Sequence, residues 1–499
     1  MQAPGTTIKN LKKHLLLRDV ITGSGNELKS RMWLGYAFLF LLTVGIGLSA
    51  AISPTLTLVT PVILLSLVVA CICIVNAEAA LYIIIAYSFF ISFVNRAFLN
   101  NALLVGVPSD ILIGLTFLGF LVRGTDLKTS IMQFSKHRVV IVLMFLYGYT
   151  AIQLFNPYGN LLTGWFPAVR KVVATFLLLF IAYNTLVSKE IIYRFIKVIF
   201  LFSTIVAIYA IIQEFHGFFD FEIRWLQEDE KRYRMTFVNG GARRMSTFPD
   251  ALSLSIVMAT TSVFFIGLLT GVKKTIYKVV LVIGISLLLL AMTFSLTRTA
   301  NVMVIAGIVL FLLTTIDTTT SKIVAGAGLF IFLVLLYAPT HNRHVYQFRN
   351  TFKGGTKDPS YIVREVNRAR IQPYLYSHPI GGGLNTTGTE GLKNNPSHPL
   401  AGFPPDSGYL KKALETGWIG FGLLLFLYFT ILKTAVRGYF STTDKKTKVI
   451  FAACAASFFA SYMGDYTQEA IGQITDIVVY FPLIAIVLRL RNEPLLLNP

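Results

Sequence analysis

Long apolar runs recur along the whole chain, and they constrain its fold more than any other feature. A helix needs about 20 apolar residues to cross roughly 30 Å of hydrocarbon, and about fourteen segments of this chain reach that length. Hydrophobic residues make up 55% of the 499 residues and only 14% are charged, which excludes an ordinary soluble domain. We therefore predict an all-α protein, a polytopic transmembrane helical bundle of about fourteen spans, with about twelve as the alternative.

The connections between these spans predict the topology. The spans fall near 32–52, 57–75, 79–94, 108–122, 139–155, 169–186, 191–213, 250–270, 279–296, 299–314, 323–338, 415–434, 448–463 and 472–488. The short connections RGTDLKTSIMQFSKHR, GVKKTIYK and KTAVRGYFSTTDKKTK are basic, whereas NPYGNLLTGWFPA contains no Lys or Arg. The positive-inside rule then places the basic connections and both ends of the chain in the cytoplasm.

This topology divides the chain into four parts. We expect a basic cytoplasmic N-terminus at 1–31, and a transmembrane bundle at 32–338 that includes an external loop at 214–249. A large external catalytic loop at 339–407 and C-terminal transmembrane helices at 408–499 complete the division.

Both long external loops are rich in arginine. They carry Arg224, Lys231, Arg232, Arg234, Arg243 and Arg244 in the first, and Arg343, Arg349, Lys353, Lys357, Arg364, Arg368 and Arg370 in the second. One interpretation is a solvated basic surface beside anionic headgroups, because long loops escape the orientation rule. We favour an external site for an anionic substrate, since the planar guanidinium suits a diphosphate better than lysine does. The net charge of +20 does not indicate nucleic-acid binding, because no basic soluble domain is present to bind it.

Two motifs in the second half of the chain resemble a known family. The stretch VREVNRARIQPYLYSHPIGGG is similar to a pattern of the bacterial O-antigen ligase and polymerase superfamily of membrane glycosyltransferases, with Arg364 at the family arginine. DSGYLKKALETGWIG resembles the ligase signature. Ser407, Gly417 and Gly420 fit that signature, while Asp406 stands where the ligases carry histidine.

Two weaker similarities precede these motifs in the family's order. RMSTFPDALSLS begins at Arg244, and TFSLTRTANVMV surrounds Arg298. The resemblance implies a fold like that of the GT-C type glycosyltransferases. It also implies transfer of a polyprenyl-diphosphate-linked oligosaccharide to a sugar hydroxyl on the external face of a bacterial cytoplasmic (inner) membrane. Because Asp406 replaces the ligase histidine, we favour a polymerase of O-antigen or exopolysaccharide.

Two other functions stay open at this point. One is an O-antigen ligase that transfers the glycan to lipid A core or another acceptor. The other is a flippase or transporter of lipid-linked sugars, which we disfavour because ionisable residues, which mark a transport path, are rare in the predicted spans. The implied partners are the lipid-linked donor, the acceptor sugar and membrane lipids, and binding of a chain-length regulator stays open. We expect no cofactor and no metal, since by the same resemblance the first outer connection, near Ser53 to Leu56, lacks the acidic residue of metal-dependent relatives.

The candidate site residues follow from the chemistry of the transfer. A base must remove the proton of the acceptor hydroxyl, and cations must neutralise the departing diphosphate. Asp406 is our candidate base, His398 and His378 are rival bases, and Arg364 is a further catalytic candidate. The candidates for the diphosphate are Arg244, Arg298, Arg364, Arg243, Arg368 and His378.

Each of these residues also has a structural interpretation. Asp406 precedes a helical pattern and would fit an N-cap, the histidines could order the loop, and the arginines could form headgroup or loop ion pairs. From Asp406, small residues at Ala413, Gly417 and Gly420 predict a continuous helix face that another helix can approach. The glycines of GGGLNTTG predict either a phosphate nest of backbone amides or a mobile lid.

Overall fold

The computed structural model describes most of the chain. The described residues are 54–99, 101, 103, 105–124, 126–238, 241–316, 318–337, 339, 342–353 and 359–491, with isolated positions between 40 and 47. The N-terminal segment 1–31 lies outside the described residues, as does most of the predicted span 32–52. The chain forms two compact units, 1–72 and 73–499, and the second contains the helical bundle.

Long helices make up this second unit. They are α4 (Ala77–Phe98), α5 (Gly106–Val122), α7 (Arg138–Ile152), α8 (Phe166–Thr185), α9 (Lys189–His216), α12 (Ala251–Leu269), α13 (Thr275–Phe294), α14 (Arg298–Thr315), α15 (Thr319–Tyr337), α19 (Gly408–Ser441), α20 (Lys445–Thr467) and α21 (Ile474–Arg491), while α3 (Pro54–Val75) begins in the first unit. Every predicted span from 57–75 onward coincides with one of these helices. Within the described residues, nine helices are long and apolar enough to cross a membrane. The predicted helical, polytopic bundle is confirmed.

Shorter elements connect these helices. They are α6 (Leu127–Ser135), η1 (Gln153–Phe155), η2 (Leu161–Trp165), α10 (Asp220–Gln227), α11 (Glu230–Thr236), α16 (Arg343–Lys353), α17 (Pro359–Ser377) and α18 (Gly388–Asn394), with strand β1 (Phe237–Val238) antiparallel to β2 (Gly241–Ala242). Polar residues start many of the helices: the side chains of Asn76, Asp126, Ser188, Asp229, Asp250, Ser407 and Asp444 each accept an N–H from the first turn that follows. Both predicted external loops thus contain helices of their own.

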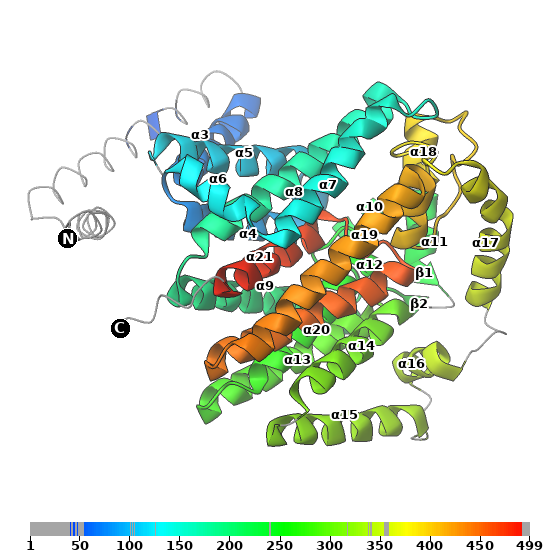
Figure 1. Ribbon diagram of the computed structural model, residues 1–499. Helices are drawn as coiled ribbons and strands as arrows, with labels where there is room; N and C mark the ends of the chain where they lie inside the picture. Colours follow the sequence, from blue (N-terminus) through cyan, green and yellow to red (C-terminus); the bar gives the residue numbers. More distant parts are fainter. Residues whose placement is uncertain are drawn as a thin grey trace, which may run out of the picture. The chain divides into compact units, whose positions relative to one another are not determined.

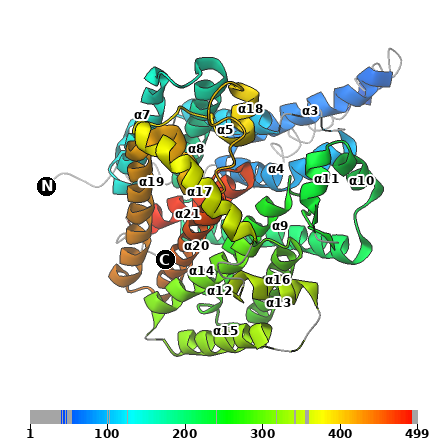
Figure 2. The ribbon, with the colours of Figure 1, turned by 90° about the vertical axis from the view of Figure 1, so that its right-hand side faces the viewer.

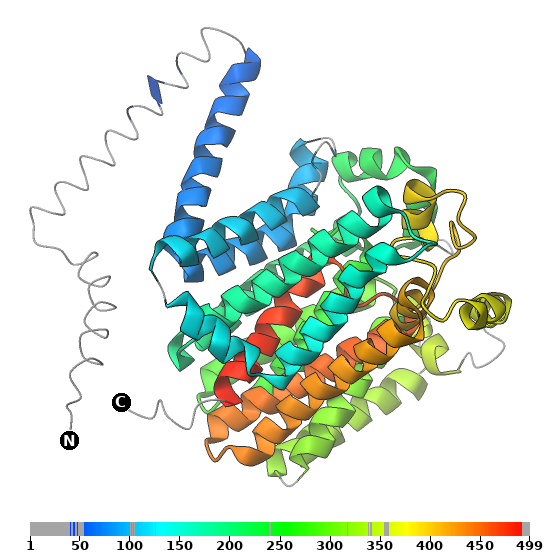
Figure 3. The same ribbon diagram turned by 45° about the horizontal axis from the view of Figure 1, so that its top comes forward.

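Helix α20 lies at the centre of the second half of the bundle, packed against α12, α14 and α19. Its sequence is rich in small residues, AACAAS, which let neighbouring helices approach closely. A Cβ at Gly267 of α12 would lie 2.8 Å from the Cα of Ala453, so the two backbones touch at this glycine. Figure 1 shows α7, α8, α19 and α20 running in nearly the same direction, and Figure 3 shows the bundle from another side.

Ion pairs show which helix ends lie together at one side of the bundle. Arg194 pairs with Glu78 (2.7 Å) and Lys189 pairs with Asp444 (3.0 Å), which joins the starts of α4, α9 and α20. Hydrogen bonds from Thr447 and Lys189 lower the pKa of Asp444, the N-cap of α20, to about 2.

The other side of the bundle carries both long loops, 214–249 and 339–407, and we call it the loop end. There Lys411 at the start of α19 pairs with Glu469 after α20 (3.0 Å). Arg96 near the end of α4 donates to two carbonyl groups of the segment before α12. Figure 2 looks onto this end, with α17 lying across it.

Candidate functional site

Helix α19 is broken inside the family-like motif, at Gly417. Its φ of 66° and ψ of −167° interrupt the helix, which frees backbone groups on both sides of the break. The loop after α17 satisfies them: the amides of Gly382 and Gly383 donate to Leu414 O (2.7 Å) and Glu415 O (3.0 Å). The expected continuous small-residue face through Gly417 is therefore wrong, because this glycine supplies a positive φ instead.

The contacts with α19 also explain why the loop after α17 contains glycines. Gly381 and Gly383 have φ of 85° and 97°, and a Cβ at Gly381 would overlap the backbone at Glu415. Amide side chains from the end of α7 hold the loop from the other side, since Gln153 donates to Ile380 O (3.1 Å). Two of the loop amides are thus engaged by α19, so they are not available as donors of a phosphate nest.

Asp406 lies immediately before the first helical turn of α19. The N-cap is Ser407, whose hydroxyl accepts from the amide of Leu410 (3.4 Å), so the interpretation of Asp406 as the cap is wrong. Asp406 instead has a φ of 48°, an uncommon conformation for a side chain other than glycine. Its carboxylate accepts a long hydrogen bond from Asn367 of α17 (3.5 Å). Asp406 is therefore held without being needed to cap the helix.

One face of α17 turns toward this carboxylate and its loop. Arg364, Asn367, Ile371, Tyr374 and His378 recur every three or four residues, which places them along one side of the helix. Ile371 on this face is buried in a small apolar cluster with residues of α19. The face therefore aligns Arg364 with Asp406, at its start, and with the histidines, at its end.

Both candidate histidines contact Tyr374. His378 stacks on the Tyr374 ring, with 3.9 Å between the ring centroids. His398 packs edge-on against the same ring, with 6.4 Å between the centroids. Nδ1 of His398 accepts from the amide of Leu400 (3.1 Å), and burial lowers the pKa of His398 below its usual range. Burial raises the pKa of Tyr374 to about 12. Each histidine thus takes part in ordering the loop, whatever else it does.

The remaining candidate arginines lie in a second group, where α9, α13 and α14 end or begin. Arg244 pairs with Glu214 (2.7 Å), its side chain only 13% exposed, and His344 bonds the same carboxylate (3.0 Å). Arg243 donates to Ser295 O (3.1 Å), and burial lowers the pKa of Arg243.

The third member of this group, Arg298, is the first residue of α14. It follows the turn to which Arg243 is bound. Arg243 and Arg244 therefore have partners within the protein, the alternative left open by the sequence.

The end of α20 lies between the α17 residues near Asp406 and the second group of arginines. Tyr466 lies beneath the guanidinium of Arg368 (5.3 Å to the ring centroid), and Thr467 bonds the hydroxyl of Thr299, next to Arg298 (2.9 Å). Arg298 and the α17 arginines therefore flank the same helix end.

A cavity of about 610 Å³ adjoins this surface, between the pair α7 and α19 and the pair α8 and α21. Its charged lining residues are Asp110, Arg170, Lys171, Glu390, Lys411, Lys412, Glu415, Asp465 and Glu469. They belong to the loop end, while the rest of the lining is mainly Leu, Ile, Val and aromatic side chains of the helices. The cavity is thus charged at one end and apolar along its length.

Most of these charges already have partners. Lys411 joins Glu390 (2.9 Å) to Glu469 (3.0 Å), and Arg170 pairs with Asp110 (3.4 Å). Burial alone would raise the pKa of Glu469, but the nearby lysines hold it below its usual range.

The carboxylates of the helices are also bonded. The Thr387 hydroxyl donates to Glu415 (2.5 Å), and Asp465 accepts from Tyr428 (3.0 Å).

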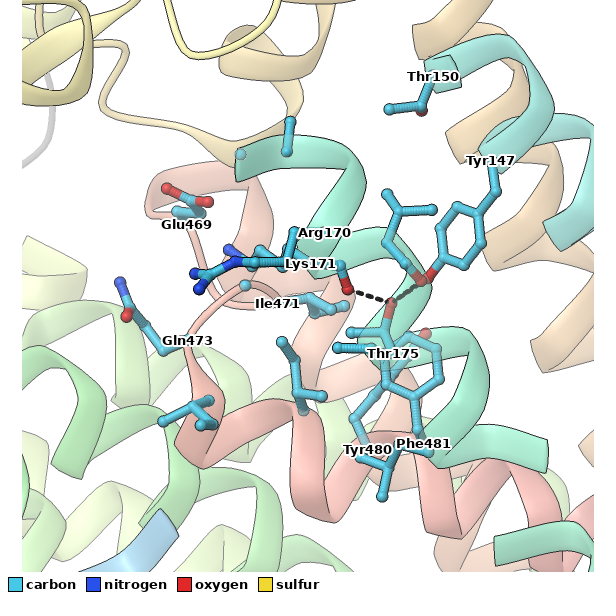
Figure 4. A pocket seen from close by; sticks show the side chains of 18 of the residues that line it. Tyr147, Thr150, Arg170, Lys171, Thr175, Glu469, Ile471, Gln473, Tyr480 and Phe481 are labelled. Atoms are coloured by element: carbon cyan, nitrogen blue, oxygen red, sulfur yellow. Dashed lines mark hydrogen bonds between the residues drawn. The ribbon is translucent and has the colours of Figure 1, made fainter. Parts of the chain in front are cut away.

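Two lysines of the lining differ from the rest. Among the described residues, the ammonium groups of Lys171 and Lys412 make no hydrogen bond or ion pair. Figure 4 shows the side chains of Arg170 and Lys171 extending toward the segment that carries Glu469 and Gln473. These two ammonium groups are therefore the cations of the lining that have no direct partner, within a lining that also carries five carboxylates.

The sequence analysis did not single out these cavity residues. The signal was an ionisable residue within or beside a predicted span, which marks functional positions in membrane proteins. Lys171 falls inside the predicted span 169–186, and Lys412 lies three residues before the span 415–434. Arg170, Lys411 and Glu415 share that signal.

The fold and site define a multi-pass helical membrane protein with a polar site at one end of its bundle. Residues 253–425 match the model of the family described as O-antigen ligase, a segment that contains Arg298, Arg364 and Asp406 but not Arg244. This match, over less than half of the chain, confirms the resemblance to the O-antigen ligase and polymerase superfamily and indicates, in general terms, a glycosyltransferase-like membrane enzyme. No curated protein matches the chain.

Proposed function

We propose that this protein transfers a polyprenyl-diphosphate-linked oligosaccharide to a sugar hydroxyl at the loop end, and that it is a polymerase of a surface polysaccharide. The observation that carries the proposal is the cavity, which has charged groups at one end, including two lysines with no direct partner among the described residues, and an apolar lining along its length. A lipid with a diphosphate head and an isoprenoid tail has the same division between charged and apolar parts. The volume of about 610 Å³ is also ordinary for a ligand pocket.

The transfer requires one proton acceptor and one site for the leaving group. The acceptor hydroxyl oxygen forms a bond to the anomeric carbon, while the bond from that carbon to the phosphate oxygen breaks and the diphosphate leaves with the electron pair. Asp406 takes the hydroxyl proton in our proposal, since its carboxylate is not used as the helix cap. Arg364 and Arg368, on the helix that contacts Asp406, lie where they could stabilise the negative charge of a diphosphate.

A polymerase needs room for two lipid-linked glycans, because one is the donor and the other the acceptor. The chain offers two places near Asp406 that hold cations without a direct partner among the described residues: the cavity with Lys171 and Lys412, and the α17 surface with Arg364. Gly408, two residues after Asp406, lines the cavity. This arrangement suits a transfer between two lipid-linked glycans, and the preference for polymerase over ligase rests on the aspartate at the position of the ligase histidine.

The decisive experiment supplies the purified protein with lipid-linked repeat units and nothing else. We expect a ladder of longer lipid-linked chains. Transfer only after addition of lipid A core would identify a ligase, and movement of the lipid across a vesicle membrane without any product would identify a flippase.

Arg364 provides a residue-level test of the same proposal. Within the described part of the chain it makes no hydrogen bond or ion pair, unlike Arg244, which is paired with Glu214. Arg364→Ala should weaken donor binding by about 10- to 100-fold, the loss of one charge-assisted hydrogen bond of roughly 1.5–3 kcal/mol. Arg364→Lys should rescue poorly, because a point charge cannot replace the guanidinium fork.

The matched control is Arg370→Ala, which removes an exposed arginine from the same helix. Equal donor affinity in the two variants would remove Arg364 from the binding site. Arg244→Ala completes the set: weaker donor binding with unchanged thermal stability would place a diphosphate at the second arginine group.

A further inference from the structure

A second, smaller cavity lies at the end of the bundle opposite the loop end. It has a volume of about 230 Å³ and is bordered by the start of α7, the second half of α19 and the end of α21. Four of its lining residues are cationic, namely Arg138, Lys433, Arg437 and Arg491, and within the described residues none of the lining is acidic. This concentration of like charge is unfavourable unless an anion accompanies it.

Within the described residues, none of these four cations has an acidic partner. In the part of the chain that the structure describes, they form no ion pair and no hydrogen bond, although Lys433 lies over the ring of Phe429 (5.2 Å). Other cations at this end do have acidic partners, as in the pair of Lys189 with Asp444. The cavity therefore gathers those cations that have no partner of their own.

The wall of the cavity beyond the cations is apolar and faces outward. Phe426 and Phe429 of α19 are 54% and 57% exposed, and Ile141 of α7 is 39% exposed. Phe426, Phe429, Lys433 and Arg437 recur every three or four residues, so they form one stripe along α19. The charged part of the stripe is at the helix end, and the aromatic part continues toward the middle of the bundle.

We propose that this cavity binds an anionic phospholipid, with the phosphate among the four cations and an acyl chain along Phe426 and Phe429. Basic pockets between membrane helices are suited to acidic lipid headgroups, because each lysine or arginine near the surface adds attraction. A soluble anion could use the cations but would leave the exposed phenyl rings without a partner. The apolar stripe therefore points to a lipid rather than to free phosphate.

A buried histidine lies beside this cavity at the start of α7. His137, the residue before α7, is buried. Burial, with Arg489 and Arg491 nearby, lowers its pKa to about 4. The site therefore keeps its charge on the four cations and does not depend on protonation of His137 near neutral pH.

The alternative to a defined lipid site is that the cations only fix the orientation of the helices in the membrane. Such residues attract all anionic headgroups through the surface potential and discriminate by net charge alone. A defined site differs from this, because its binding depends on which cations are removed and not on how many.

The full-length protein, purified in a neutral detergent, provides the test. Binding of phosphatidylglycerol, phosphatidylcholine with the same acyl chains, and inorganic phosphate would be measured by native mass spectrometry and thermal unfolding. We expect phosphatidylglycerol to bind and stabilise the protein most strongly. The double variant Arg138→Gln/Arg437→Gln should bind it about 25-fold more weakly, about fivefold for each cation.

The matched control is Lys445→Gln/Lys446→Gln, which removes the same charge from the same end outside the cavity. This variant should keep the wild-type affinity. An equal loss of affinity in both variants would overturn the proposal in favour of a diffuse surface potential. Stabilisation by inorganic phosphate equal to that by phosphatidylglycerol would overturn the assignment to a lipid.

Discussion

A single methyl group at Gly417 tests how the site is built. The φ of 66° and ψ of −167° at this position lie in a region that only glycine adopts readily. A Cβ there would also overlap the carbonyl oxygen of Pro379. Gly417→Ala must therefore release the loop from α19, which breaks the bonds Gly382 N to Leu414 O, Gly383 N to Glu415 O and Trp418 N to Pro379 O. At about 1 kcal/mol for each bond, the cost is about 3 kcal/mol.

Amide hydrogen exchange of the segment 380–387 measures this cost directly. A loss of about 3 kcal/mol raises the population of the open loop by about 10²-fold, so exchange should accelerate by that factor. The matched control is Gly422→Ala in the same helix, where nothing lies within 4 Å of the added Cβ. That variant should exchange as slowly as wild type and gain about 0.5–1 kcal/mol of helix stability. Wild-type exchange in Gly417→Ala would refute the reasoning, because the three bonds would then not hold the loop.

The other predictions concern the base, the pH dependence and the topology. Asp406→Asn should lower the transfer rate by about 10² to 10⁴ without changing thermal stability, because the next residue is the helix cap; full activity in this variant would exclude Asp406 as the base. Asp444→Asn should cost less than about 1 kcal/mol at neutral pH, because the side chain is 38% exposed. The pKa of Asp444 is depressed to about 2, so its contribution is present above pH 4 and is lost as the pH falls toward 2; thermal unfolding curves of variant and wild type should converge there, and a constant difference would contradict this assignment. A cysteine introduced at Asn394 should react with an impermeant thiol reagent in spheroplasts while one at Thr443 should not, and the reverse result would invert the topology.

The helices of the bundle could be predicted from the sequence because apolar length alone determines what can span a membrane. The break in α19 could not. Gly417 and Gly420 have the spacing of a close helix contact, and the pattern of residue types is the same whether a glycine serves by being small or by adopting a positive φ. Only the partner of the break, the loop around Gly382, distinguishes the two, and the sequence does not show that the loop returns to the helix.

Only part of the candidate site could be predicted from the sequence. A motif identifies which residue stands at a position, so Arg364 and Asp406 could be selected, and the structure places Asp406 against α17, the helix that carries Arg364. A motif does not identify ion-pair partners that lie far away in the chain. Glu214 at the end of α9 bonds both Arg244 and His344, although His344 at the start of α16 is 130 residues away in the chain.

The loop between α17 and α19 has both of its ends fixed to the same helix, and this explains how a loop can hold a reactive carboxylate. One end leaves α17 and docks in the break at Gly417 through the amides of Gly382 and Gly383. The other end of the loop passes through Asp406 into the first residue of α19. That residue lies ten residues before Trp418, whose amide donates to the carbonyl of Pro379 in the loop. Because the two attachments lie on one rigid segment of about three helical turns, motion of the loop cannot carry Asp406 far from α17. The glycine break therefore positions the proposed base, although it touches neither the carboxylate nor the substrate.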